Sequence, residues 1–116
     1  MKNHVRRAIA FVAAKALSGS ENSALYDYNQ SAYFQFGGTV NDATVSIFDY
    51  DQGCYVSGNL PSLFHYGEGQ HIQLILGEDQ FRGFDYGSGN HFSGSVNGFL
   101  ISLYDYEFGQ YFNYSM

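Results

Sequence analysis

One short pattern recurs five times along this chain, and it constrains the fold more than any other feature. Each copy reads aromatic, Asp or His, Tyr, two variable residues, Gly or Ser, one variable residue, and Tyr or His. The copies span residues 26–33, 48–55, 64–71, 84–91 and 104–111. A longer duplication relates residues 38–50 to residues 94–106 at a constant offset of 56. Repetition of this kind indicates an architecture assembled from a single supersecondary unit.

Turn chemistry identifies that unit as a β-hairpin. Each Tyr-x-x-Gly segment supplies a glycine that can adopt positive φ, and Asn97-Gly98 is a strong two-residue hairpin signal with Asn41-Asp42 as its counterpart. Ser31 replaces the glycine in the first copy, so we expect the first of these turns to be the least regular.

The register within a hairpin follows from the hydrophobic pattern. A four-residue loop from Tyr50 to Gly53 pairs Asp49 with Cys54 and separates the side chains cleanly into two faces. The predicted inner face is aliphatic and glycine-rich, and in the two duplicated hairpins it includes Val45, Ile47, Cys54, Val56, Gly58, Phe99, Ile101, Leu103, Phe112 and Tyr114. Glycines such as Gly58 and Gly94 would allow close packing or sheet curvature on this face.

These observations predict a mainly β fold, in which an N-terminal α-helix precedes an antiparallel meander of about ten strands. The sheet is expected to close into a barrel or to fold as a two-sheet sandwich, because closure removes exposed strand edges. A parallel β-solenoid with one repeat per coil is the alternative. Residues 1–20 are assigned to the helix and residues 21–116 to the five-repeat region, within a single domain.

The helix is expected over residues 4–18, ended by Gly19. Val5, Ile9, Val12 and Ala16 recur at helical spacing, and this apolar stripe predicts a helix docked by one face on its own acidic sheet. The alternative is a basic amphipathic helix that contacts a membrane surface or an acidic partner.

Charge is divided between the two regions. The first twenty residues include four basic residues, Lys2, Arg6, Arg7 and Lys15. From Glu21 onward there are eleven acidic residues and one basic residue, Arg82. A region as acidic as residues 21–116 should repel the phosphate backbone of a nucleic acid, and this argues against nucleic-acid binding. The single Cys54 excludes an intramolecular disulfide. The apolar run near the start resembles a signal peptide, but Lys15 interrupts it and no membrane span is present, so we expect a cytoplasmic protein.

Catalytic and metal sites are not predicted. Asp27, Asp49, Asp85 and Asp105 recur at one position, with His65 in the central copy, and an acid just before a turn caps loop amides. Exchange of such an acid to Asn should therefore be mild. His71 and His91 share a face that His65 does not, so three histidines cannot converge on a metal. We therefore expect no enzyme activity and no cofactor.

The second face of the hairpins is aromatic and otherwise made of Ser, Thr, Asn and Gln. Its binding candidates are Tyr26, Tyr28, Phe48, Tyr50, Tyr55, Tyr66, Tyr86, Tyr104, Tyr106 and Tyr111, accompanied by Tyr33, Phe64 and Phe84. Such rings either form cross-strand ladders that stabilise the sheet or contact a partner. The sequence thus favours a non-catalytic β-repeat interaction module that forms a homo-oligomer through this face, with binding of a carbohydrate or another small ligand as the alternative.

Overall fold

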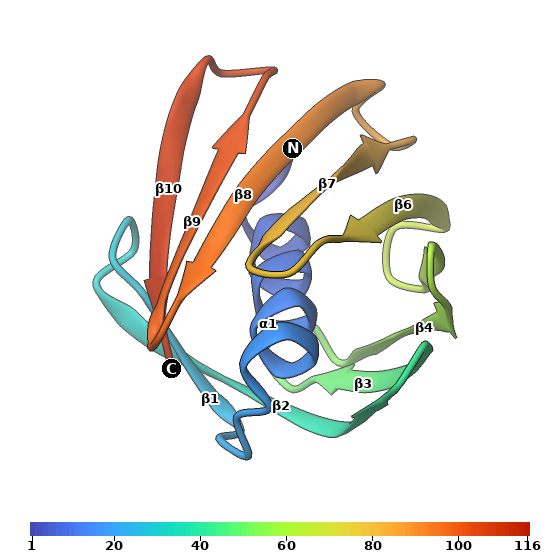
Figure 1. Cartoon of the computed structure of the whole chain (residues 1–116). Coiled ribbons are helices and arrows are strands. Elements are labelled where there is room, and N and C mark those ends of the chain that lie inside the picture. Colours follow the sequence, from blue (N-terminus) through green and yellow to red (C-terminus); the bar gives the residue numbers. More distant parts are fainter.

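The computed structural model describes residues 1–116 and shows a helix enclosed by a closed ten-strand antiparallel barrel (Figure 1). Helix α1 spans Asn3–Ser18, close to its predicted bounds. The strands are β1 (Ala24–Asp27), β2 (Ala32–Asn41), β3 (Thr44–Asp49), β4 (Cys54–Asn59), β5 (Ser62–His65), β6 (Gln70–Leu76), β7 (Gln80–Asp85), β8 (Asn90–Asn97), β9 (Leu100–Asp105) and β10 (Gln110–Ser115). Each strand pairs with its neighbour in the chain, and β1 pairs with β10 to close the barrel. The meander and its closure as a barrel are therefore confirmed.

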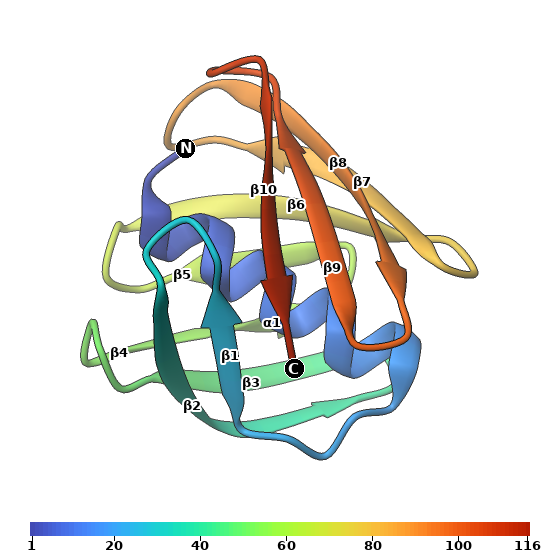
Figure 2. The same ribbon diagram turned by 90° about the vertical axis from the view of Figure 1, so that its left-hand side faces the viewer.

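The position of α1 corrects the expectation of a helix docked by one stripe. Figures 1 and 2 show α1 inside the barrel with strands on all sides of it. Every residue from Val5 to Ala14 is buried, including Ala14, which lies opposite the apolar stripe. The helix fits in the lumen because many of its side chains are those of alanine, which are small. Alanine is also the residue that most favours helix formation. The helix ends at Gly19 in the left-handed conformation, as expected.

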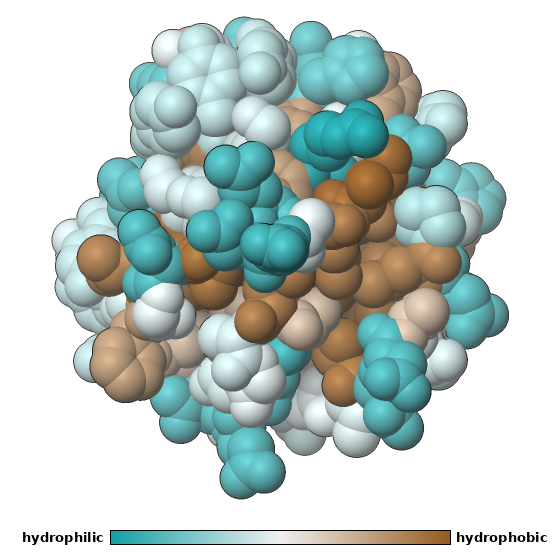
Figure 3. All heavy atoms as spheres, viewed as in Figure 1, coloured by the Kyte–Doolittle hydropathy of each residue, from teal (hydrophilic) through white to brown (hydrophobic).

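The strand register agrees with the predicted alternation. Asp49 pairs with Cys54 across a four-residue loop, and Val45, Ile47 and Val56 are buried in the lumen. In the space-filling view of Figure 3, apolar side chains gather toward the middle of the face, over the lumen, while hydrophilic ones dominate its outline. The inner face thus forms one core together with α1.

Inward-facing glycines mark the points at which neighbouring backbones approach each other. A Cβ atom at Gly58 would lie 2.3 Å from the carbonyl oxygen of Ser62, and one at Gly94 would lie 2.3 Å from Phe81 and from the carbonyl oxygen of Ser102. These contacts confirm that glycine is required for close packing on this face.

Two turn predictions were wrong in detail. Asn97 pairs with Leu100, so Gly98 and Phe99 occupy the centre of that turn, and Phe99 is exposed at the rim instead of facing the core. Asn41 likewise pairs with Thr44, so Asp42 and Ala43 occupy the centre of the counterpart turn.

The first Tyr-x-x-Ser turn is the least regular of its kind, as expected. In the other four copies the turn glycine donates its amide to the carbonyl oxygen four residues earlier, at 2.7 to 2.8 Å, and Ser31 makes no such bond to Asp27. Even so, Ser31 adopts a φ of 53°, close to the 65° of Gly53, and Asp27 pairs with Ala32 across the same four-residue loop.

The helix of this structure is not long and apolar enough to cross a membrane.

Candidate binding surface and the acidic rim

The recurring acids lie at one rim of the barrel, each at the end of a strand and facing inward. Asp49 Oδ1 accepts the amides of Asp51 and Gln52, at 3.0 and 3.1 Å. Equivalent backbone amides donate to Asp27, Asp85 and Asp105, and in the central copy the amide of Glu68 donates to Nδ1 of His65. The predicted capping role of these side chains is therefore confirmed.

The same acids also face the basic end of α1, a relation that the sequence alone did not reveal. Arg6 lies 3.0 Å from Oδ2 of Asp105, and the amino group of Met1 lies 3.2 Å from the same oxygen. Arg7 lies 3.8 Å from Asp27 and 3.2 Å from Asp51. The charge division along the chain thus becomes a set of ion pairs inside one end of the barrel.

Aromatic rings complete the environment of the two arginines. The Arg6 guanidinium lies 3.7 Å from the centre of the Phe112 ring, and that of Arg7 lies 3.6 Å from the centre of Phe34. Stacking of this kind suits the weakly hydrated guanidinium group and helps both side chains to remain buried.

Burial and hydrogen bonding shift the pKa values of several groups at this rim. Desolvation raises the pKa of Asp49, whose Oδ2 has no hydrogen-bond partner, although Arg7 opposes the shift. Desolvation, assisted by His4, lowers the pKa of His65. Hydrogen bonds from Lys2 and then His4 lower the pKa of Glu68.

The outer wall carries the predicted aromatic residues as five equivalent triads. In each triad a central ring contacts the Tyr two residues later and the Tyr or His opposite it on the next strand. The ring centres are 4.7 to 5.1 Å apart, and the ring planes are inclined by 67 to 77°. Edge-to-face pairs of this kind stabilise the sheet by about 0.5–1.5 kcal/mol each beyond the area they bury.

Backbone hydrogen bonds join successive triads. The amides of Tyr66, Tyr86 and Tyr106 donate to the carbonyl groups of Tyr55, His71 and His91 in the preceding hairpins, at 3.0 to 3.3 Å. The five triads therefore lie on successive hairpins around the outside of the barrel, and together they are called the aromatic band. The band comprises Tyr26, Tyr28, Tyr33, Phe48, Tyr50, Tyr55, Phe64, Tyr66, His71, Phe84, Tyr86, His91, Tyr104, Tyr106 and Tyr111.

All ten binding candidates from the sequence lie in this band. Its central rings are half-buried, whereas eight of its tyrosines leave between 52 and 72% of their surface exposed. His71 and His91 replace tyrosine in two copies of the repeat, and both complete triads. Cys54, which was expected on the inner face, is half-buried, and burial raises the pKa of its thiol.

The wall around the band is almost free of charge. Among strand residues, the four aspartates point inward and are buried, which leaves Arg82 as the one charged side chain on the outside. Cross-strand bonds such as Thr44 to Asn59, at 3.1 Å, and Ser102 to Asn113, at 3.0 Å, occupy the remaining surface. The other acids are confined to segments outside the strands.

Shallow depressions lie beside the exposed tyrosines. One of about 480 Å³ is bordered by Tyr50 and Tyr55 and floored by Gly38, Thr39, Ser46 and Phe48. Another, of about 470 Å³, lies beside Tyr106 and includes Gln73, Arg82, Asn90, His91 and Ser93. Both combine aromatic rings with hydroxyl groups, and the second also includes the amide side chains of Gln73 and Asn90.

Comparisons with protein-family models, with curated proteins and with solved structures found no match to this chain.

Proposed function

We propose that the protein is a non-catalytic interaction module that associates with further copies of itself through the aromatic band. The observation that carries this proposal is the combination of large exposed rings with a wall on which Arg82 is the one charged strand residue. Tyrosine provides a large contact area at low conformational cost, together with a hydroxyl group that can bond across an interface. Exposure of so many aromatic rings on one wall is typical of an interface.

A second copy is the favoured partner because of where the charges lie. Two chains with a net charge of −6 repel each other, and contact is least costly where neither presents a charge. The outer wall comes closest to that condition, since Arg82 is its one charged strand residue and the acids are either buried at the strand ends or held outside the strands. A two-fold dimer would place the same patch on both sides of the contact.

The experiment measures molar mass by light scattering coupled to size exclusion at micromolar concentration. We expect a dimer or small closed oligomer, which is weakened by combining Tyr106→Ser with Tyr111→Ser. The matched control combines Phe99→Ser with Leu100→Ser, which removes comparably exposed apolar side chains at the opposite end of β9. A monomeric wild-type chain would refute the proposal, as would equal weakening by both double variants. Circular dichroism verifies that each variant is folded.

Binding of a neutral carbohydrate on the same wall is the second candidate. The depressions beside Tyr50 and Tyr106 support it, because an exposed ring flanked by hydroxyl groups, and at Tyr106 also by amide groups, suits a sugar. A titration with neutral oligosaccharides distinguishes the two candidates. Carbohydrate binding would be favoured if the wild-type chain is monomeric and binds an oligosaccharide saturably. The variant Tyr50→Ser should then lose this binding.

A further inference from the structure

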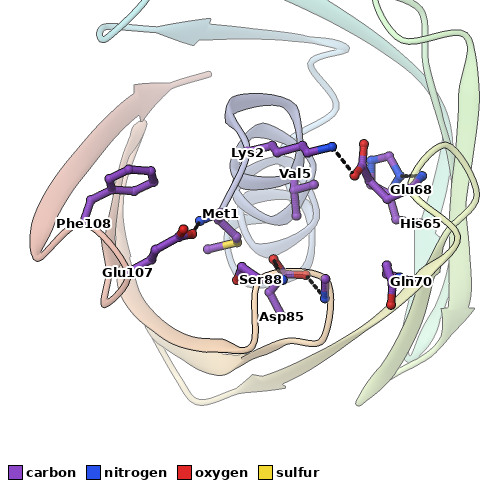
Figure 4. A pocket seen from close by; sticks show the side chains of 11 residues that line it. Met1, Lys2, Val5, His65, Glu68, Gln70, Asp85, Ser88, Glu107 and Phe108 are labelled. Carbon is purple, nitrogen blue, oxygen red and sulfur yellow. Dashed lines mark hydrogen bonds and ion pairs between the residues drawn. The ribbon is translucent and has the colours of Figure 1, made fainter.

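A cavity of about 380 Å³ opens at the acidic rim, between the start of α1 and the turns that follow β5, β7 and β9. Figure 4 shows Lys2 and Met1 on the helix side, with Glu68 and His65 on one flank, Asp85 and Ser88 on a second and Glu107 on a third. Its volume lies in the range of roughly 300–1,000 Å³ that is usual for small-molecule pockets. Exposed side chains at its edge, including Lys2 and Phe108, give access from solvent.

Asp85 distinguishes this cavity from the rest of the rim. Its side chain is buried, and its two oxygens accept the amides of Gly87 and Ser88 at 3.1 and 3.2 Å. No lysine, arginine or amino-terminal nitrogen lies within 4.0 Å of it, in contrast to Asp27 and Asp105. A buried carboxylate without a cation is costly. Asp49 has no ion pair either, but it lies outside the cavity and within the field of Arg7.

The charges that line the cavity do not balance. Asp85, Glu68 and Glu107 contribute three carboxylates, whereas Lys2 and the amino group of Met1 contribute two ammonium groups, which pair with Glu68 and Glu107. One negative charge therefore remains, and it lies on Asp85. A single positive charge in the cavity would neutralise it.

Two further polar atoms of the wall have no partner. Nε2 of His65 and Oγ of Ser88 are both buried and unbonded, and His65 is only 1% exposed. Because Nδ1 of His65 accepts the Glu68 amide, the hydrogen-bond network assigns the proton of the neutral ring to Nε2. The lowered pKa of His65 supports the neutral form. Nε2 is thus a free donor, and the Ser88 hydroxyl can donate or accept.

We propose that this cavity binds a small hydroxylated amine of the amino-alcohol or amino-sugar class. Its ammonium group would pair with Asp85. Its hydroxyl groups would bond to Nε2 of His65 and Oγ of Ser88, which expose less than 1 Å² each and become accessible when the side chains that cover them move. An organic cation fits better than a metal ion, because no group of three His, Cys, Asp or Glu side chains is arranged to hold a metal. This site is separate from the aromatic band, which lies on the outside of the wall.

The test is an NMR titration of the full-length, ¹⁵N-labelled protein with glucosamine. Glucose serves as the uncharged probe with the same ring, and ammonium chloride as the charge without the hydroxyl groups. We expect saturable shifts of the Gly87 and Ser88 amides with glucosamine alone. Asp85→Asn should weaken binding about tenfold or more, which corresponds to about 1.4 kcal/mol. Asp79→Asn, an exposed acid at the opposite end of β7, should leave it unchanged.

Ser88→Ala provides a second variant that leaves every backbone cap of Asp85 in place, and it should weaken glucosamine binding severalfold. The proposal is overturned if glucose or ammonium chloride shifts the same amides as strongly as glucosamine. It is equally overturned if glucosamine produces no saturable shift at these amides, or if the variants at Asp85 and Asp79 bind it alike.

Discussion

His65 shows how a single residue can depart from a repeat and keep its structural role. It replaces the aspartate of the other copies, and its Nδ1 accepts a turn amide as the aspartate oxygens do. A neutral imidazole suits a site beside His4, whose ring centre lies 5.5 Å away. Burial and that neighbour lower the pKa of His65, so the folded protein holds this ring in its uncharged form.

Stability should therefore decrease on acidification through the histidine range. The pKa of His65 is lower in the folded state than in the unfolded chain. As the pH falls below about 6.5, His65 is therefore protonated in the unfolded chain before it is protonated in the folded protein. The free energy of unfolding then decreases until the folded-state pKa is reached, whereas above this window His65 contributes no slope. Urea unfolding at a series of pH values measures the effect, and His65→Asn, which can still accept the amide, should flatten it.

His71 provides the matched control, because it lies exposed on the outer wall. His71→Asn should leave the pH dependence of unfolding as it is in the wild type. If His65→Asn and His71→Asn give the same profile, burial of His65 does not govern this window. The lowered pKa of Glu68 adds a second loss of stability, which falls in the more acidic carboxylate range.

At the scale of the element, each hairpin was predictable from its own sequence. The alternation around Asp49 was sufficient to fix the loop length, the strand pairing and the face that enters the core. The same alternation places the recurring aspartates on the inner face, next to residues such as Ile47. The sequence therefore contained two indications of the ion pairs at the rim: aspartates on the inner face of the strands, and four basic residues among the first twenty. The partners are far apart, however: Arg6 and Asp105 are separated by 99 positions.

The ion pairs change what is expected of an Asp-to-Asn exchange at these turns. Asn at position 105 can still accept the Glu107 amide through Oδ1, but it removes the charge opposite the buried Arg6. Loss of one member of a buried pair costs about 3 kcal/mol or more. Asp85→Asn breaks no ion pair and forfeits one amide hydrogen bond, a cost of about 1 kcal/mol. Denaturant midpoints measured on both variants test this ranking.

Equal costs for the two exchanges would show that capping alone determines the role of these acids. A double-mutant cycle that combines Asp105→Asn with Arg6→Met isolates the pair, and we expect a coupling energy of about 1 kcal/mol or more. A coupling near zero would contradict the assignment.

At the scale of the whole molecule, the enclosed helix is the feature that the sequence could not disclose. Arg6 and Arg7 have the appearance of solvent-facing charges, because their pairing partners belong to other parts of the chain. Alanines add little to a hydrophobic stripe, so the helix has the pattern of a surface element. Because alanine side chains are small, they keep the helix thin enough to fit inside the barrel. The residues of α1 fill the centre of the barrel, and the strands bury the helix on all sides.

Enlargement of Ala14 distinguishes an enclosed helix from one that is docked by its stripe. Ala14 lies opposite Val5, Ile9 and Val12, so on a docked helix it would face water, and leucine, which also favours helix, would be tolerated there. In this structure Ala14 is buried, and Ala14→Leu should destabilise the fold by about 1–3 kcal/mol through overpacking. Ala16→Leu, at the half-buried end of the helix, should cost less. Thermal and urea unfolding measure both variants. An unchanged stability of Ala14→Leu would place this face of the helix in solvent and would exclude a helix enclosed by the barrel.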